Sequence, residues 1–254
     1  MITLIKSELR KMLLRKSVLI TWAASLLFGR LLIHNGTVGD IYADVFYKSY
    51  GYTPIMGLVM FMILSGAYTL EYNSNMSDLI NTTKNGKKKL VIAKGIGAGI
   101  ATSIVNLSMV ITIYLDGFKK ANFKGLDMSL KNLWYFEGIN SNLNVFQMMI
   151  IVSITVIAAS FFFSQLGLYL SSISKSASMP FIVGGLVMGI PYILEHALPS
   201  KLIVMTPLWG MISSQLIKYK VSTGIMVIQG MIFIVGYLIL PKLTYTAFTK
   251  KDKR

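Results

Sequence analysis

The chain contains no cysteine and few charged residues. Only 14% of its 254 residues are charged, and the acidic side chains number 10 against 25 basic ones. The absence of cysteine excludes disulfide bonds, thiolate metal sites and cysteine nucleophiles. Because an average soluble domain has about a quarter of its residues charged, the low charge argues against a water-soluble domain.

Long apolar blocks take the place of the missing charge. Hydrophobic residues make up 54% of the chain, and its mean hydropathy is +0.62. A helix needs about 20 apolar residues to cross a bilayer. The sequence therefore predicts an all-α, polytopic membrane protein with one transmembrane domain spanning residues 1–254. Its six predicted transmembrane helices cover residues 18–34, 54–70, 90–115, 145–169, 179–198 and 221–240.

The basic residues gather on alternate connections between these blocks. One side of a six-helix arrangement holds the N-terminal stretch, Lys84 to Lys94, Lys175 and the C-terminal lysines, and the other side holds about half as many cations. Positively charged connections stay in the cytoplasm. We therefore expect a multi-pass protein of a bacterial plasma membrane with both termini cytoplasmic. The net charge of +15 follows from this topology, and no nucleic-acid partner is predicted.

Residues 1–16 form an amphipathic pattern. Apolar residues recur at helical spacing beside Lys6, Arg10 and Lys11; they are Ile2, Ile5, Leu9, Met12 and Leu13. This pattern is typical of a helix that lies in the interface against anionic lipid. The alternative is a polar extension of the first membrane helix.

The connection at residues 72–89 has a second amphipathic pattern. Met76, Leu79 and Ile80 stand at positions i, i+3 and i+4, and Asn85-Gly86 supplies a residue that ends a helix. We therefore predict a short helix on the cytoplasmic face with an apolar ridge to which a partner can bind.

Several of these residues resemble a known family, the type-2 ABC transporter permeases that include antimicrobial-peptide, lantibiotic and phenol-soluble modulin exporters. In that family a glutamate ends the second membrane helix, and a short coupling helix and a small-Lys pair follow. Here the matching residues are Glu71, Leu79, Ile80, Thr82, Lys87 and Ala93-Lys94. Thr83 stands where the family has proline. The segments "LYLSSISKSAS" and "LPSKLIVMTPLWG" also resemble family segments, so the resemblance covers the whole chain.

The resemblance implies the membrane subunit of an exporter and not an enzyme. A cytoplasmic ABC ATPase would bind Mg-ATP and contact the coupling segment through Glu71, Met76, Leu79, Ile80, Thr82 and Lys87. A second permease, identical or a sister subunit, would complete the path. The chain has no phosphate-binding G-x-x-x-x-G-K-[ST] motif, so we expect no cofactor on this chain. The implied substrate is an amphipathic or hydrophobic molecule, such as a bacteriocin or a cytolytic peptide.

Polar residues within or beside the apolar blocks are costly and often functional. Arg30, His34, Glu195 and His196 are candidates for a translocation path, and their spacing matches no metal motif. Gly95 and Gly99 form a small-x-x-x-small pair that favours close helix packing. Four amides are expected to make interhelical hydrogen bonds: Asn106, Gln147, Gln165 and Gln229.

The sequence leaves other function classes open. A membrane enzyme is disfavoured, because Ser160 and Ser164 lie outside any G-x-S-x-G turn. A non-transporting receptor or immunity protein that binds a toxin is the alternative from another class. An exporter of drugs or lipids is an alternative within the transporter class.

Overall fold

The computed structural model describes residues 1–36, 40–69, 71, 86–195, 197 and 203–251, with the main chain alone at 35, 36, 250 and 251. This part of the chain is helical and contains no β-strand. Its helices are α1 (Ile2–Leu13), α2 (Lys16–Gly36), α3 (Ile41–Gly51), α4 (Thr53–Leu64), α7 (Gly86–Lys120), η1 (Leu130–Asn132), η2 (Trp134–Phe136), α8 (Val145–Ile173), α9 (Ser178–Leu194), α11 (Pro207–Met211), α12 (Ser214–Lys218) and α13 (Thr223–Lys251).

Four helices are long and apolar enough to cross a membrane: Lys16–His34, Gly86–Lys120, Val145–Ile173 and Thr223–Thr249. Two shorter helices, Thr53–Leu64 and Ser178–Leu194, are also apolar. The protein is therefore a polytopic, helical membrane protein, as its composition predicted.

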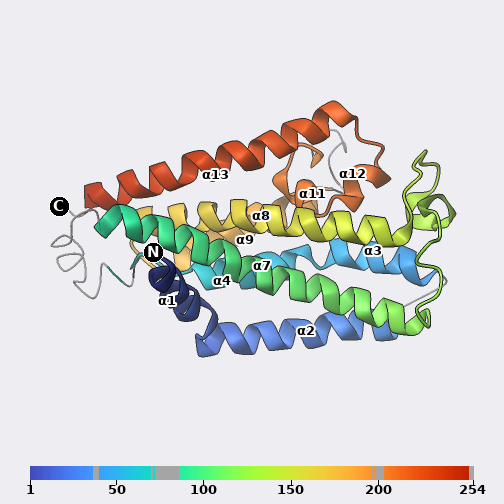
Figure 1. Ribbon diagram of the computed structural model, residues 1–254, viewed down its shortest axis with the longest axis horizontal. Helices are drawn as coiled ribbons and strands as arrows, with labels where there is room; N and C mark the ends of the chain where they lie inside the picture. Colours follow the sequence, from blue (N-terminus) through green and yellow to red (C-terminus); the bar gives the residue numbers. More distant parts are fainter. Residues whose placement is uncertain (37–39, 70, 72–85, 196, 198–202, 252–254) are drawn as a thin grey trace.

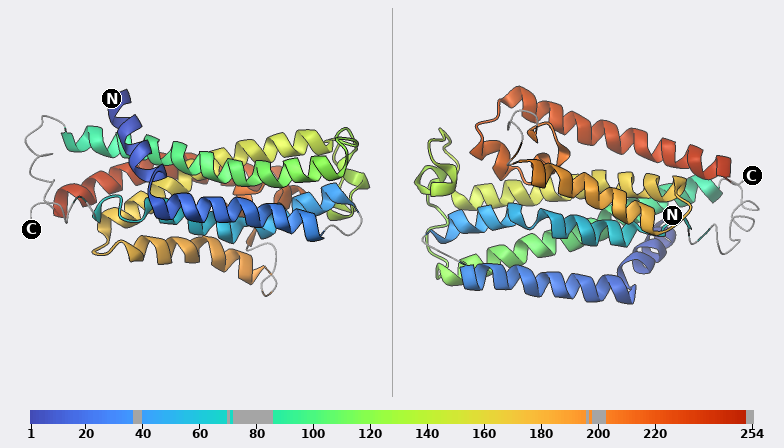
Figure 2. Two further views of the ribbon diagram at one scale, coloured as in Figure 1. Left: turned by 90° about the horizontal axis from the view of Figure 1, so that it is seen from below. Right: turned by 180° about the vertical axis from the view of Figure 1, so that it is seen from behind.

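The long helices run side by side along the length of the molecule (Figure 1). Helix α7 is central, because it contacts α1, α2, α3, α4, α8 and α13. Helices α2 and α13 lie on opposite flanks, and α9 packs on α4 and α8 (Figure 2). The start of α7, the end of α13 and α1 lie at one end of the bundle, which we call the N-terminal end. The opposite end, the far end, carries α3, α12 and the segment 121–144.

The second apolar block differs most from its prediction. Helix α3 starts at Ile41 and α4 follows it after a single residue, Tyr52, whose φ of −86° and ψ of −11° stay close to helical values. The two helices therefore extend one after the other along the bundle (Figure 1). The expected helix at 54–70 instead ends at Leu64, because Ser65 turns to ψ 128° and Gly66 has a φ of +78°.

Other helix ends shift by smaller amounts. Helix α13 continues beyond the predicted end at Leu240 to Lys251, with Pro241 inside it. Helix α9 ends at Leu194, so the predicted helix at 179–198 is shorter here, and residues 198–202 lie outside the described part. Helices α7 and α8 extend past the predicted 90–115 and 145–169 to Lys120 and Ile173.

Small residues let α4 and α9 approach closely. A Cβ added to Gly57 of α4 would lie 2.7 Å from the Cβ of Met188, and a Cβ added to Gly184 of α9 would overlap the ring of Phe61. Met188 and Phe61 are both fully buried. Each helix thus places a large side chain over a glycine of the other, which is how helices associate without a hydrophobic driving force in lipid.

Candidate functional site

A buried cluster of charged side chains lies at the N-terminal end of the bundle, around Lys94 of α7. The Lys94 Nζ lies 2.7 Å from the Glu8 Oε2 and 2.9 Å from the Glu71 Oε1. The other carboxylate oxygen of Glu8 accepts a hydrogen bond from Lys11 at 2.7 Å. One ammonium therefore joins α1, the segment after α4, and α7. We call Glu8, Glu71 and Lys94 the charged triad.

The triad is shielded from water. The side chains of Glu8 and Lys94 are 1% and 4% exposed, and that of Glu71 is 14% exposed. The Lys94 Nζ also lies 5.4 Å from the centre of the buried ring of Tyr68. Buried charges are stable only when they are paired and hydrogen-bonded, so both carboxyl groups depend on the Lys94 ammonium that they share.

Local sequence explains why α1 brings Glu8 to this position. A Cβ added to Gly97 of α7 would lie 3.4 Å from the Ile5 carbonyl oxygen and from the Leu9 nitrogen. The absence of a side chain there lets the main chain of α1 come close to α7. Glu8 and Met12, one helical turn apart, are buried on this face of α1. The expected amphipathic helix thus buries an acidic residue against α7, a feature that the apolar pattern of residues 1–16 did not reveal.

The two carboxyl groups titrate in opposite directions. Burial acts to raise the pKa of Glu8, but the ion pairs with Lys94 and Lys11 outweigh it and hold that pKa below its ordinary value. Burial raises the pKa of Glu71 above its ordinary value, because the attraction of Lys94 only partly offsets it and Glu8 adds repulsion. The same lysine thus lies beside one carboxyl group whose pKa is lowered and one whose pKa is raised.

A second contact ties the start of α2 to the end of α4. The guanidinium of Arg15, between α1 and α2, donates a hydrogen bond of 2.6 Å to the Ser65 carbonyl oxygen. The Ser65 hydroxyl in turn donates to the Ala177 carbonyl oxygen at 2.5 Å. The α1–α2 junction, the end of α4 and the start of α9 are therefore joined beside the charged triad.

The predicted coupling residues divide between described and undescribed parts of the chain. Met76, Leu79, Ile80 and Thr82 lie outside the described residues. Glu71 lies just before that segment and belongs to the triad. Lys87, in the first turn of α7, places its Nζ 5.9 Å from the centre of the Phe248 ring of α13. Glu71, just before the undescribed segment, thus contacts α7, and Lys87, soon after that segment, contacts α13.

Gly95 and Gly99 face α8. The side-chain amide of Gln165 donates a hydrogen bond of 3.0 Å to the Gly95 carbonyl oxygen. A Cβ at Gly99 would overlap the ring of Phe161. Further along α7, the Asn106 amide donates to the Ser160 hydroxyl at 2.9 Å. The predicted interhelical bonds of Asn106 and Gln165 are therefore confirmed.

The other two amides have different partners. Gln147 is not interhelical: it forms a capping box with Asn144 at the start of α8. The Gln229 amide of α13 donates to the main-chain carbonyl oxygens of Val204 and Thr206, in the segment before α11.

The candidate path residues at the far end lie in two separate places. Arg30 approaches Asp116 of α7, with 3.8 Å between the Nε and the Oδ1. The His34 carbonyl oxygen accepts a hydrogen bond of 2.6 Å from Lys120. Glu195 instead accepts a hydrogen bond of 2.8 Å from the Tyr219 hydroxyl. Among the described residues, therefore, Glu195 shares no contact with Arg30 or His34.

Glu195 lines a pocket of about 360 Å³ at the far end, between α2, α3, α9 and α12. Burial is the larger cause and the hydrogen bond to Glu195 the second cause that raise the pKa of Tyr219 to about 12. The Trp209 and Tyr219 rings stack with 4.7 Å between their centres. His196 lies outside the described residues. Within the described part of the chain no three His, Asp or Glu side chains come together as metal ligands would.

No model of a known protein family matches the chain, and no protein of curated function has a similar sequence.

Proposed function

We propose that this protein is the membrane subunit of an ATP-driven exporter. The charged triad is the observation that carries the proposal. Glu71 stands immediately before residues 72–85, Lys94 stands soon after them, and one ion pair of 2.9 Å joins the two. A force applied by a partner to that connecting segment would therefore reach α7.

The position of α7 supports this mechanism of coupling. Helix α7 contacts α1, α2, α3, α4, α8 and α13, so a displacement of its N-terminal turns would spread to both flanks of the bundle. Buried ion pairs hold two elements in one register, because a displaced partner leaves an unpaired charge in a nonpolar environment. The triad would thus make α1, the end of α4 and α7 move as one body.

The proposal includes six membrane crossings. Four helices are long enough to span a bilayer, and α3 with α4 would form a fifth crossing. Residues 41–64 reach about 36 Å at 1.5 Å per residue, against about 30 Å of hydrocarbon. Helix α9 would be the sixth. The termini and the triad would then face the cytoplasm of a bacterial cell, on the side with more lysine and arginine.

The proposed partners supply what this chain lacks, namely ATP hydrolysis and the second half of the path. A separate ABC ATPase would bind Mg-ATP and contact residues 72–85, and a second permease would complete the translocation path. An amphipathic peptide, such as a bacteriocin or a cytolytic peptide, is the proposed substrate. The toxin-binding immunity protein remains the second candidate, because it would need the same membrane anchoring but no ATPase.

The deciding experiment compares two double variants. Leu79→Ala with Ile80→Ala removes the proposed apolar anchors, whereas Leu19→Ala with Ile20→Ala removes the same residue pair from α2, where the side chains are 39% and 69% exposed. We expect the first variant to lose co-purification with an ATPase encoded beside its gene and to lose peptide-stimulated ATP turnover in liposomes. Anchor residues in helix-in-groove contacts commonly contribute about 2 kcal/mol or more each. The α2 variant should retain both properties.

The outcomes separate the candidates. If the Leu79/Ile80 variant binds the ATPase and exports peptide as the unmodified protein does, the coupling proposal fails. If the unmodified protein binds a toxin but no ATPase, the immunity protein is the correct assignment. Glu71→Gln should preserve ATPase binding and lower stimulated turnover, because it weakens the link to Lys94 without changing the docking surface.

A further inference from the structure

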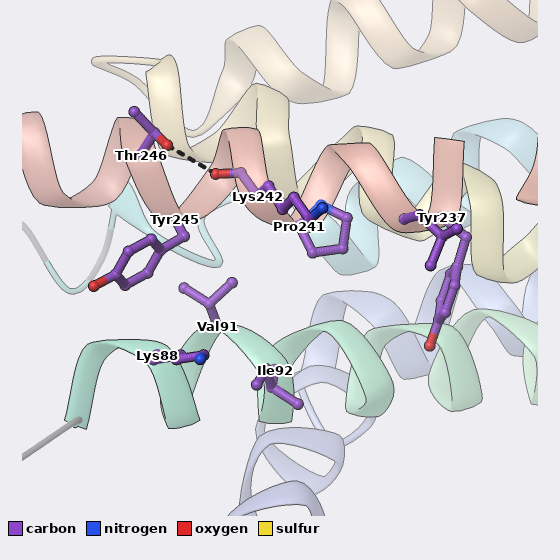
Figure 3. Close-up of a pocket in the computed structure, with 9 residues that line it drawn as sticks. Lys88, Val91, Ile92, Tyr237, Pro241, Lys242, Tyr245 and Thr246 are labelled. Atoms are coloured by element: carbon purple, nitrogen blue, oxygen red, sulfur yellow. Dashed lines mark hydrogen bonds between the residues drawn. The ribbon is translucent and has the colours of Figure 1, made fainter. Parts of the chain in front are cut away.

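A groove separates the start of α7 from the last turns of α13 at the N-terminal end of the bundle (Figure 3). Its volume is about 630 Å³. Lys88, Val91 and Ile92 of α7 form one wall, and residues of α13 form the other: Tyr237, Leu238, Pro241, Lys242, Tyr245 and Thr246. The α13 residues recur at helical spacing, so they belong to one face of that helix.

The groove is apolar along its length toward the middle of the bundle. Ile92 and Leu238 are 40% and 59% exposed, and the Tyr237 ring is 38% exposed. The groove opens on the side of the bundle between two helices that are long and apolar enough to cross the membrane. A hydrocarbon chain of a surrounding lipid would therefore contact this wall.

Two lysines stand beside this apolar wall near the helix ends. Lys88 and Lys242 are exposed, and neither pairs with a carboxylate in the described part of the chain. The two carboxylates described at this end, Glu8 and Glu71, are held by Lys94. The groove thus combines two lysines at one end with apolar surface at the other, which is complementary to the phosphate and the hydrocarbon of an anionic lipid.

We propose that this groove binds one anionic phospholipid, with the phosphate between Lys88 and Lys242 and an acyl chain along Ile92 and Leu238. A lysine near a negatively charged leaflet is attracted to it, and the Tyr245 side chain lies between the two helices at the same end of the groove as Lys88 (Figure 3). This assignment needs only membrane insertion and does not depend on export.

Charge favours a lipid over a second copy of the chain. In a two-fold contact the same surface meets itself, so Lys88 and Lys242 would face the same lysines of the other copy. Like charges in a low-dielectric contact repel strongly. An anionic lipid neutralises the two ammonium groups instead.

The test measures the retention of phosphatidylglycerol by the purified full chain. Lys88→Gln with Lys242→Gln removes the proposed phosphate contacts. Lys16→Gln with Lys175→Gln is the matched control, because these lysines are also exposed and lie near the same end. The protein is released from nanodiscs that contain phosphatidylcholine and increasing phosphatidylglycerol, and native mass spectrometry counts the bound lipids. We expect one tightly held phosphatidylglycerol and at least tenfold weaker binding in the groove variant alone.

A second pair of variants tests the acyl contact without changing charge. Leu238→Trp fills the groove, and Leu243→Trp places the same side chain on α13 at a residue that is 43% exposed and outside the groove. Only Leu238→Trp should lower lipid retention. The proposal is overturned if the groove variants retain phosphatidylglycerol unchanged, if the control variants lose it equally, or if phosphatidylcholine is held as tightly. It is also overturned if the groove variants change the oligomer mass and leave lipid binding intact.

Discussion

Glu8 and Lys94 stand 86 positions apart in the sequence, and their side chains meet at 2.7 Å in a buried site. This contact joins α1 to α7 beside the close approach of the two helices at Gly97. Because Lys94 also serves Glu71, its removal would leave two buried carboxylates without their shared cation.

Lys94→Met is therefore expected to destabilise the protein by about 3 kcal/mol or more, the usual cost of breaking a buried ion pair from one side. Thermal unfolding in detergent measures this as a lower Tm. Lys89→Met, on an exposed residue of the same helix, should change the Tm little. Adding Glu8→Gln to Lys94→Met should restore part of the lost stability, because without Lys94 the buried charge of Glu8 keeps only the exposed Lys11 as its partner. Equal Tm values for Lys94→Met and Lys89→Met would contradict the structural role of the triad.

The opposite pKa shifts of Glu8 and Glu71 predict opposite pH dependences. The stability that the lowered pKa of Glu8 contributes is present above its ordinary pKa of 4.5 and is lost as the pH falls through the lower folded-state value. For Glu71 the raised pKa contributes stability below 4.5 that is lost as the pH rises through the folded-state value.

Two glutamine variants separate these contributions. The cost of Glu8→Gln should be nearly constant well above pH 4.5 and should shrink as the pH falls through the folded-state pKa of Glu8. Glu71→Gln should be nearly neutral at low pH and become relatively stabilising as the pH rises, because glutamine resembles the protonated acid. Chemical denaturation across this pH range gives the two curves. Parallel curves for the two variants would show that the two carboxyl groups do not differ in this way.

The close contact between α7 and α8 at Gly99 can be tested by replacing that glycine with alanine. Alanine normally stabilises a helix relative to glycine by about 1 kcal/mol, and Gly230 of α13 has open space where a Cβ would stand. At Gly99 the new methyl group would overlap the Phe161 ring. Gly99→Ala should therefore lower the Tm, and Gly230→Ala should leave it unchanged or raise it. Should both variants unfold at the same temperature, the close approach at Gly99 would be unimportant.

Much of the membrane architecture could be predicted, because lipid imposes one simple requirement on composition and length. The second apolar block shows where that logic fails. Asp44 and Lys48 lower the hydropathy of residues 41–51, so the predicted helix began at Pro54. In the structure Asp44 is 6% exposed, and Lys48 donates a hydrogen bond to the Leu32 carbonyl oxygen. Hydropathy scores the transfer of a side chain from water to an apolar medium, and it does not register that Asp44 is buried in the protein and that Lys48 bonds to a main-chain carbonyl oxygen.

The candidate site was predictable only in part. Glu71 and Lys94 were both expected at the ends of the coupling segment, from a resemblance to a family. Glu8 was not, since a lone acidic residue in a basic helix could equally face water. Its partner lies 86 positions away, and no local pattern contains that information. The signal that the sequence offered was the position of Glu8 one helical turn before Met12, a member of the apolar stripe of residues 1–16.

The six-crossing arrangement predicts which side of the membrane each connection faces. Because the chain contains no cysteine, single cysteines can be introduced and labelled without background. Four exposed positions bracket the two shorter crossings: His34 and Lys89 for α3 with α4, and Lys175 and Ala197 for α9. Each is replaced singly by cysteine and treated with a membrane-impermeant maleimide. In intact cells the cysteines at 34 and 197 should react, and those at 89 and 175 should react only in inverted vesicles. If α3 and α4 do not cross, positions 34 and 89 will react from the same side; if α9 does not cross, positions 175 and 197 will do so. Either result would mean that the chain crosses the membrane fewer than six times. Labelling of position 89 in intact cells would show that the basic end of the bundle faces outward, where the proposed ATPase could not bind it.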